Sequence, residues 1–331
     1  MPPMPNPSTP SLPIGKTTRK TSVARLFEKH RDTLQLTHLA GSLERSIAVT
    51  EERIWPADLV GHLNLIHAAR LHIVGAAELE WARQQPIDSV RHYLATILAA
   101  QPPAVVFADG CEVPDAVRDL CIEHDLPLLT SPQASASVID QLRQYLSHEL
   151  AERTALHGVF MDVFGIGVFI TGDAGVGKSE LALELISRDH GLVADDMVEF
   201  SRIAPNVIEG RSPELLRDIL EVRGLGMLNI RTIFGETACR RKMRLRLVVY
   251  LKRRSGDMRD EAERLPETQD TQDILGLAMP HATLSVAAGR NVAVLLEAAA
   301  RNTILKLRGI DSTRDFIARH AEWMARANAP E

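Results

Sequence analysis

The sequence is poor in cysteine and contains no long apolar run. Its three cysteines, Cys111, Cys121 and Cys239, are widely spaced, so they indicate neither a disulfide framework nor a Cys-x-x-Cys metal pair. Such cysteine usage suits a reducing compartment. The longest apolar stretch, Val159 to Ile170, contains Asp162 and is shorter than the roughly 20 residues that a membrane helix needs. We therefore expect a cytoplasmic protein without a membrane partner.

The chain also lacks an excess of positive charge. Lysine and arginine together number 38 against 43 aspartates and glutamates, which gives a formal net charge of −5 at pH 7. A general nucleic-acid-binding protein usually shows the opposite balance, gathered into a basic patch or stripe. We therefore expect no nucleic-acid partner.

Length and composition indicate two domains behind a short extension. A chain of 331 residues is long enough for two domains of about 100–200 residues each. Six prolines fall within the first thirteen residues, without the apolar core of a signal peptide, so we expect residues 1–20 to be a disordered extension. An α/β domain is expected over residues 21–150, and a catalytic domain over residues 151–331.

Short apolar strands alternate with helical segments in residues 21–150, and this alternation predicts a parallel α/β sheet. The expected strands are Leu71–Val74, Ala104–Phe107 and Leu126–Leu129, and the expected helices are Ser22–Thr33, Ala76–Arg83, Ile87–Ala99, Pro114–His124 and Ser135–Glu152. No catalytic constellation stands out in this half. The pairs Asp109-Gly110 and His124-Asp125 are typical of turns and helix caps, and the role of the domain stays open.

The second domain contains a glycine-rich motif between a strand and a helix. It reads Gly172, Asp173, Ala174, Gly175, Val176, Gly177, Lys178 and Ser179, which fits the phosphate-binding loop (P-loop) pattern G-x-x-x-x-G-K-[ST]. The β-branched run before it and the helix formers after it supply the required context. Backbone N–H groups of such a loop, with the positive end of the following helix, bind phosphate. Lys178 would reach the outer phosphates, and the Ser179 hydroxyl would bind magnesium.

His157 precedes a predicted hairpin that leads into this loop. The residues on either side of Gly165-Ile166-Gly167 read as two antiparallel strands joined by a tight turn. With the turn centred near Ile166, His157 falls opposite Gly175, at the rim of the loop. A histidine beside a phosphate is suited to carry a proton or to stabilise an oxyanion.

Acidic residues supply candidates for a base and for a metal ligand. Asp195 and Asp196 follow an apolar run, and the carboxyl ends of strands are where open α/β sheets place their chemistry. Successive residues of a strand face opposite sides, so at most one of the two is expected to face the phosphates. Glu221 is suited to hold a metal and Arg223 a phosphate, and an exposed ion pair is an equally good interpretation of both.

Lys252 follows the strand predicted at residues 246–251, whereas in many phosphate-loop proteins such a strand ends in the aspartate that supports magnesium. The second acid must therefore come from elsewhere, which favours Asp195, Asp196 or Glu221. The polar segment 255–271 reads as a loop. Beyond it we expect a strand at residues 282–287, a long helix from Gly289 to Arg308, and a last helix from Arg314 to Arg326.

Taken in order, these pieces resemble the HPr kinase/phosphorylase family, bifunctional regulators of the bacterial sugar phosphotransferase system. The matching segments are His157-Gly158-Val159, Thr171 to Glu180, Leu192 to Asp196, Glu221 to Gly226 and Gly289 to Asn291. The phosphate loop alone is generic, whereas the Val-Ala-Asp-Asp and Glu-Val-Arg-Gly-Leu-Gly segments together are highly specific. The first domain resembles its counterpart in the family in size and pattern alone.

The resemblance implies a two-domain α/β protein whose carboxyl-terminal P-loop kinase domain is related to the phosphoenolpyruvate carboxykinase type. It implies that ATP and Mg²⁺ phosphorylate a serine of the phosphocarrier protein HPr, and that inorganic phosphate reverses this with release of pyrophosphate. A homohexamer is implied as well. The implied site residues are Gly172 to Ser179 for nucleotide or phosphate, Ser179 and Glu221 for the metal, and His157, Lys178, Asp196 and Arg264 for catalysis.

Within this set, Asp196 is implied to be the base of the kinase reaction and the acid of phosphorolysis. A carboxylate in both roles would need a pKa raised toward neutral, to which a neighbouring acid would contribute. Residues 220–229 are implied to matter for both activities, and residues 286–291 for phosphorolysis. Arg259 lies close enough in sequence to be the alternative to Arg264.

Three positions depart from the family pattern. Ala174 stands for a serine, Ala288 for a proline, and Asp189-His190 for glycine-histidine, and none of these changes removes a reactive group. Rival interpretations are a P-loop kinase for a small molecule, a relative of the ATP-using phosphoenolpyruvate carboxykinases, and a nucleotide-dependent sensor. The sequence has no Asn-Lys-x-Asp motif, which disfavours a GTPase.

Overall fold

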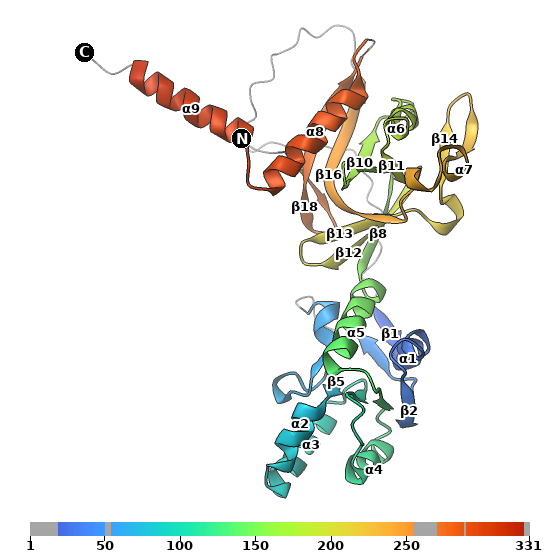
Figure 1. Cartoon of the computed structure of the whole chain (residues 1–331), viewed down its shortest axis with the longest axis vertical. Helices are drawn as coiled ribbons and strands as arrows, with labels where there is room; N and C mark the ends of the chain where they lie inside the picture. Colours follow the sequence, from blue (N-terminus) through green and yellow to red (C-terminus); the bar gives the residue numbers. More distant parts are fainter. Residues whose placement is uncertain (1–18, 50–53, 254–269, 288, 328–331) are drawn as a thin grey trace, which may run out of the picture. The chain divides into compact units, whose positions relative to one another are not determined.

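The computed structural model describes residues 19–49, 54–253, 270–287 and 289–327. These residues form two compact units (Figure 1). The first takes in the described residues up to Glu152 together with the short segment Ile203–Pro205, and the second takes in the other described residues. Residues 1–18 of the expected amino-terminal extension lie outside the described residues.

The amino-terminal unit is an α/β sheet covered by helices on both faces. Its elements are β1 (Lys20–Ser22), α1 (Val23–His30), β2 (Thr37–Ala40), β3 (Ser46–Ala48), η1 (Pro56–Leu59), β4 (Val60–His62), η2 (Leu65–His67), β5 (Leu71–Val74), α2 (Ala76–Arg83), α3 (Ile87–Ala99), β6 (Val105–Phe107), α4 (Asp115–Glu123), β7 (Leu128–Thr130) and α5 (Ser135–Glu149). The main sheet has the order β2-β7-β6-β5-β4. Strands β4 to β7 are parallel, as predicted, and β2 is antiparallel to β7.

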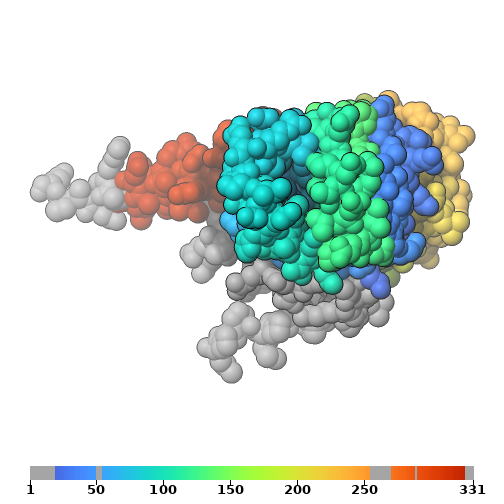
Figure 2. All heavy atoms as spheres, turned by 90° about the horizontal axis from the view of Figure 1, so that it is seen from below, coloured from blue at the N-terminus to red at the C-terminus, as the bar shows by residue number. Residues whose placement is uncertain are grey.

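Alternate residues of the central strands enter two different cores, because successive side chains of a strand face opposite sides. Val106 and Leu129 pack with α1 and α5 on one face. Val105, Phe107 and Leu128 pack with α2, α3 and α4 on the other face. Residues of α2 and α3 (cyan) lie beside residues of α4 (green) on the face turned to the viewer in Figure 2.

Local capping in this unit follows the sequence. The Ser22 hydroxyl accepts a hydrogen bond from the Arg25 N–H, so it caps α1 as expected. The Asp109 carboxylate accepts from the backbone N–H groups of Ala76 and Ser135, which start α2 and α5. The expected role of Asp109 in turn and cap chemistry is therefore confirmed, and these hydrogen bonds lower its pKa. The helix predicted to reach Glu152 ends three residues earlier.

The second unit is built on a larger mixed sheet. Its elements are β8 (Glu152–His157), β9 (Val159–Val163), β10 (Ile166–Gly172), α6 (Lys178–Ile186), β11 (Gly191–Ala194), β12 (Met197–Ala204), β13 (Val207–Arg211), η3 (Glu214–Leu216), β14 (Ile219–Val222), β15 (Gly226–Asn229), α7 (Ile230–Phe234), η4 (Glu236–Ala238), β16 (Lys242–Arg253), β17 (Thr271–Ile274), β18 (Leu277–Val286), α8 (Val292–Leu307) and α9 (Ser312–Ala327). The sheet runs β11-β9-β10-β16-β13-β12-β8, and β18 pairs with both β16 and β17. In this described part of the chain, no helix is long and apolar enough to cross a membrane.

The core of this unit holds the site in place from both faces of the sheet. On one face, α6 and α8 pack over Val168, Ile170 and Val249. On the other face Phe169 and Phe200 meet edge to face, with ring centroids 5.1 Å apart. Burying these large apolar side chains fixes β10 and β16 as a rigid base, since each contributes about 1.5–3 kcal/mol when fully removed from water.

Strand direction gathers several strand ends at one edge of this sheet. Strand β10 is parallel to β16, and β16 is parallel to β18. Strands β10 and β11 are both antiparallel to β9, so they run in the same direction as each other. The carboxyl ends of β10, β11, β16 and β18 therefore lie at the same edge, which we call the site edge.

The hairpin before the phosphate loop has a different register from the one predicted. Phe164 and Gly165 form its two-residue turn, with φ of 53° and 83°, and Ile166 pairs with Val163 as the first residue of β10. The prediction that the turn centres near Ile166 was wrong. The pairing of β9 with β10 ends at Val159 and Ile170, and in this register His157 does not fall opposite Gly175. The histidine reaches the site edge instead through its contact with Asp196, which follows β11.

Candidate active site

The phosphate loop leaves β10 at Gly172 and enters α6 at Lys178. Gly172 is held against β16: a Cβ at this position would lie 2.4 Å from the Leu251 carbonyl oxygen. A side chain cannot be accommodated there, so glycine is required by the close approach of the two strands. This packing sets the direction in which the loop leaves the sheet.

Polar contacts hold the loop in shape. Lys178 Nζ donates to the carbonyl oxygens of Gly172 and Asp173, at 3.2 and 3.1 Å, so its positive charge lies over the beginning of the loop. Tyr250 Oη donates to Asp173 Oδ1 at 2.8 Å, and this hydrogen bond raises the pKa of the tyrosine. Arg253 donates to the Gly175 carbonyl oxygen at 2.8 Å.

Sequence reasoning missed Tyr250 and Arg253. Both lie near the end of the strand in which an aspartate was sought, and neither belongs to a local motif. Their contacts come from the parallel pairing of β16 with β10, where Thr171 pairs with Tyr250 and Gly172 with Leu251. The pairing of strands that are far apart in the chain cannot be read from a short stretch of sequence. The sequence therefore contained no indication that Tyr250 and Arg253 contact the phosphate loop.

The side chains of His157 and Asp196 contact each other at the site edge. His157 Nδ1 lies 3.0 Å from Asp196 Oδ1, and the two side chains are 68% and 61% exposed. The backbone supports the pair, because the Gly158 N–H donates to the Asp196 carbonyl oxygen at 3.1 Å. Asp196 has φ of 65°, a left-handed conformation that Asp and Asn adopt more readily than most residues.

The adjacent Asp195 has the opposite environment. It is 6% exposed, and its Oδ2 accepts the backbone N–H of Glu221 at 2.8 Å. Burial raises its pKa, more than these backbone hydrogen bonds lower it. Asp195 is thus buried and Asp196 exposed, although neither lies in a strand as predicted, because β11 ends at Ala194. Among the causes that raise the pKa of Asp195, burial is the largest, and the charges of Asp196 and Glu221 contribute less.

The residues predicted to bind magnesium supply suitable donors. Ser179 is the second residue of α6, and Glu221 lies in the β14–β15 hairpin with an exposed side chain. Among the described residues, no three or more His, Cys, Asp or Glu side chains form a group that could hold a metal. Magnesium needs no such group, because it commonly binds one or two carboxylates, substrate phosphates and water. The hydroxyl and carboxylate oxygens present fit that mode of binding.

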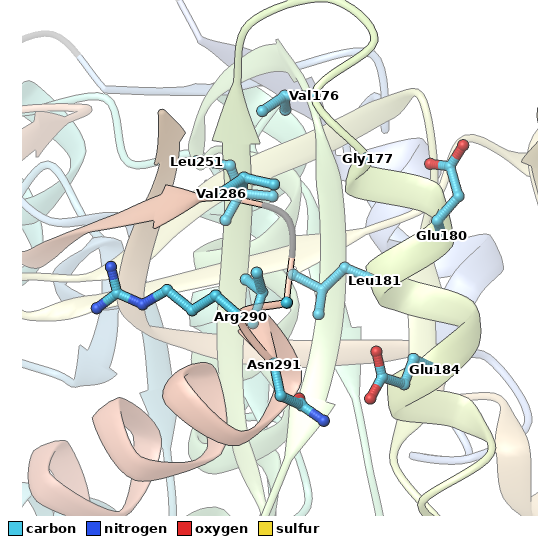
Figure 3. Close-up of a pocket in the computed structure, with 11 residues that line it drawn as sticks. Val176, Gly177, Glu180, Leu181, Glu184, Leu251, Val286, Arg290 and Asn291 are labelled. Carbon is cyan, nitrogen blue, oxygen red and sulfur yellow. The ribbon is translucent and has the colours of Figure 1, made fainter. Parts of the chain in front are cut away.

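A pocket of about 490 Å³ adjoins the phosphate loop. In Figure 3, Leu251 and Val286 on the strand side face Leu181 of α6, and the Arg290 side chain extends away from that helix. Its full lining is Val176, Gly177, Glu180, Leu181, Glu184, Leu251, Val286, Gly289, Arg290, Asn291 and Val292. The loop thus borders the same pocket as Val286 and residues 289–292.

Two predicted features fall outside the described residues, namely the arginine pair Arg264 and Arg259 and the family departure at Ala288. The departure at Asp189 has a structural basis. Asp189 follows α6 with φ of 68°, a conformation that glycine adopts freely and aspartate tolerates. Its neighbour His190 is buried, with Nε2 3.2 Å from Glu297 Oε1 of α8.

Comparison with known proteins identifies the family to which this chain belongs. The family model described as "HPr Serine kinase C-terminal domain" matches residues 148–320, and "HPr Serine kinase N terminus" matches residues 21–146. The protein named HPr kinase/phosphorylase from Azoarcus sp. (strain BH72) is 65% identical to this chain, and the match covers 92% of this chain and 97% of the relative. The protein of the same name from Aromatoleum aromaticum is 62% identical, and the match covers 95% of this chain and 100% of the relative. The solved Hpr(Ser) kinase/phosphatase from Coxiella burnetii is 32% identical, with a TM-score of 0.43 over 49% of this chain and 98% of that chain. The chain therefore belongs to the HPr kinase/phosphorylase family.

Proposed function

We propose that this protein uses ATP to phosphorylate a serine of HPr and uses inorganic phosphate to reverse that reaction at the same site. The observation that carries the proposal is the contact between His157 and Asp196, which lies at the same sheet edge as the phosphate loop. The named activity of the relatives supports the choice of HPr as the substrate.

In the kinase direction, Asp196 accepts the proton of the HPr serine hydroxyl as its oxygen attacks the γ-phosphorus of ATP. The bond between that phosphorus and the β–γ bridging oxygen breaks, and ADP leaves. Phosphoryl transfer depends mainly on alignment and charge neutralisation, and Lys178 supplies a positive charge beside the transferred group. The contact of His157 Nδ1 with Asp196 Oδ1 stabilises the orientation of the Asp196 carboxylate.

In the reverse direction, an oxygen of inorganic phosphate attacks the phosphorus of phosphoserine-HPr. The serine oxygen leaves and takes a proton from Asp196, and pyrophosphate is formed. Phosphorolysis is a different reaction from the reversal of the kinase step, which would use ADP, but both reactions move a proton to or from the same serine oxygen, so one carboxyl group serves as base in the first and as acid in the second. We propose Arg264 as a further catalytic group that acts near the HPr serine.

We propose that Ser179 and Glu221 hold Mg²⁺, which when bound neutralises charge on the phosphates. The exposed His157 and Asp196 side chains support a protein as the acceptor, since a small-molecule kinase usually encloses its acceptor in a water-excluded site. A homohexamer and a cytoplasmic location are further proposals that rest on the family resemblance. Light scattering coupled to size-exclusion chromatography measures the first directly.

The test uses the purified full chain with HPr, radiolabelled ATP and Mg²⁺. Label should appear on an HPr serine, and Lys178→Ala should abolish this transfer. Lys29→Ala, at an exposed lysine of α1, is the matched control and should transfer label normally. Nucleotide hydrolysis without labelled HPr would overturn the proposal in favour of a sensor, and label on a small metabolite would favour a small-molecule kinase.

A further inference from the structure

The pocket beside the phosphate loop extends from the loop along one side of α6. Val176 and Gly177 line it at the loop, and Glu180, Leu181 and Glu184 line it farther along the helix. Glu184 lies seven residues after Gly177, so at 1.5 Å per residue the pocket follows α6 for about 10 Å. A ligand whose phosphates lie on the loop would therefore place the rest of its body in this pocket.

The pocket has aliphatic walls on two facing sides. Leu251 and Val286, near the ends of β16 and β18, face Leu181 of α6 (Figure 3), and Val176 and Val292 add further apolar surface. Its volume of about 490 Å³ falls within the range of about 300–1,000 Å³ that is typical of small-molecule sites. Two aliphatic walls suit a flat ring system, because a ring between them is removed from water on both of its faces.

The charged side chains of the pocket disfavour a second anion. Its lining contains Glu180, Glu184 and Arg290, and the Arg290 side chain extends away from α6 (Figure 3). The two glutamates are four residues apart, so they lie on the same face of the helix, where their like charges repel each other. Glu184 Oε1 accepts a hydrogen bond from Arg188 at 2.7 Å, and its other oxygen can accept one from a ligand. Carboxylates only accept hydrogen bonds, so these two favour a neutral group that carries amino or hydroxyl donors.

Asn291 adds a hydrogen-bond donor to the same pocket. Its Oδ1 accepts the Val294 N–H at 3.0 Å and thereby caps α8, so the NH₂ group of the amide is turned away from that bond. The side chains of Glu184 and Asn291 point into the space between α6 and the start of α8 (Figure 3). An acceptor and a donor together match adenine, which presents an amino group beside a ring nitrogen that accepts a hydrogen bond. Guanine presents a carbonyl oxygen in place of that amino group, and a carboxylate repels it.

We propose that this pocket holds the adenosine of ATP. The ribose hydroxyls lie beside Glu180, and adenine lies between the aliphatic walls. The amino group of adenine donates to Glu184, and a ring nitrogen accepts from Asn291. Glu184 and Asn291 are thus the residues that select the base, in addition to the loop residues that bind phosphate. This inference rests on the proposed use of ATP and extends it to the choice of nucleotide.

The experiment is titration calorimetry on the full chain without HPr, with ADP and IDP as the probes in the presence of Mg²⁺. The two nucleotides differ in one group, because the base of IDP has a carbonyl oxygen where adenine has its amino group. With IDP a hydrogen bond to a charged group is lost, so ADP should bind at least about tenfold more tightly than IDP.

Two substitutions test the residues that contact the base. Glu184→Gln offers both an acceptor and a donor, so the difference between ADP and IDP should fall to about threefold or less. Asn291→Asp keeps an oxygen that caps α8 but lacks the amide donor, so ADP should bind about tenfold more weakly. The matched control is Glu199→Gln, at a glutamate outside the pocket that pairs with Arg211 at 3.0 Å, and it should keep the original difference.

The outcomes separate this inference from the proposed function. Equal binding of ADP and IDP would show that the phosphates carry the affinity, and it would overturn the adenosine pocket even if HPr is still labelled from ATP. A difference between the nucleotides that is unchanged in Glu184→Gln would overturn the role of that residue. Absence of binding by both nucleotides would overturn this inference and the proposed use of ATP together.

Discussion

Replacing Asp196 with asparagine separates catalysis from stability at the centre of the site. The His157–Asp196 pair joins side chains that are 68% and 61% exposed, and such exposed pairs contribute at most about 1 kcal/mol to folding. Asparagine also tolerates the left-handed backbone at this position, so the substitution adds little strain. The free energy of unfolding should therefore change by less than about 1 kcal/mol.

The chemical effect should be far larger. A side chain that transfers a proton in the transition state accelerates a reaction by about 10²–10⁴-fold, so kcat for HPr phosphorylation should fall by about that factor in Asp196→Asn. The assay is initial-rate transfer of label to HPr, together with denaturant unfolding of the same preparations. A kcat within a few-fold of the original enzyme would refute the role of Asp196 as base.

Asp189→Asn is the matched control for this experiment. Asp189 has a similar φ, 68° against 65°, and follows α6 in the chain. The free energy of unfolding of the Asp189→Asn protein and its kcat for HPr phosphorylation should both remain close to those of the original protein. A comparable loss of rate in this control would show that the assay reports a general effect of replacing a left-handed aspartate.

Three further substitutions test the fold around the site and in the amino-terminal unit. Gly172→Ala should destabilise the protein by about 1–3 kcal/mol in denaturant unfolding, because its Cβ would lie 2.4 Å from the Leu251 carbonyl oxygen. Tyr250→Phe removes the hydrogen bond to Asp173, worth about 0.5–1.5 kcal/mol, so the KM for ATP should rise about two- to tenfold with a smaller change in kcat. Burial lowers the pKa of His72, so below its ordinary value of 6.5 the unfolded chain binds more protons and stability falls as the pH decreases. In His72→Gln this loss should be smaller, as measured by unfolding on either side of pH 6.5.

Controls distinguish each of these effects from its alternatives. Gly61→Ala places a Cβ with no atom closer than 3.9 Å, so it should cost far less than the change at Gly172. Burial also lowers the pKa of His30, and its contribution is present in both proteins of the His72 comparison. An unchanged KM in Tyr250→Phe, or identical pH profiles with and without His72, would contradict the reasoning given for those residues.

Strong local patterns were sufficient for much of the amino-terminal unit. The helices Ala76–Arg83 and Ile87–Ala99 were predicted with their observed bounds, because Pro86 interrupts the helical pattern between them. Strand β2 was missed: three of its four residues are exposed, so it has no apolar alternation and forms through its pairing with β7. Edge strands of this kind depend on tertiary contacts rather than on their own composition.

The active site shows the same division between local and tertiary information. The phosphate loop and the two acids follow strands in the sequence, so their positions could be predicted from pattern alone. The hairpin register was wrong because Gly167 was interpreted as part of the turn. A Cβ there would lie 2.4 Å from the Arg244 carbonyl oxygen, so this glycine serves strand packing, and the turn consists of Phe164 and Gly165.

The most direct test of a single site that works in both directions is the product formed from phosphoserine-HPr and inorganic phosphate. The account predicts one pyrophosphate for each HPr serine released, and loss of both products in Asp196→Asn to the same extent as loss of kinase activity. Release of HPr with inorganic phosphate as the sole product, or phosphorolysis that persists in Asp196→Asn, would contradict it.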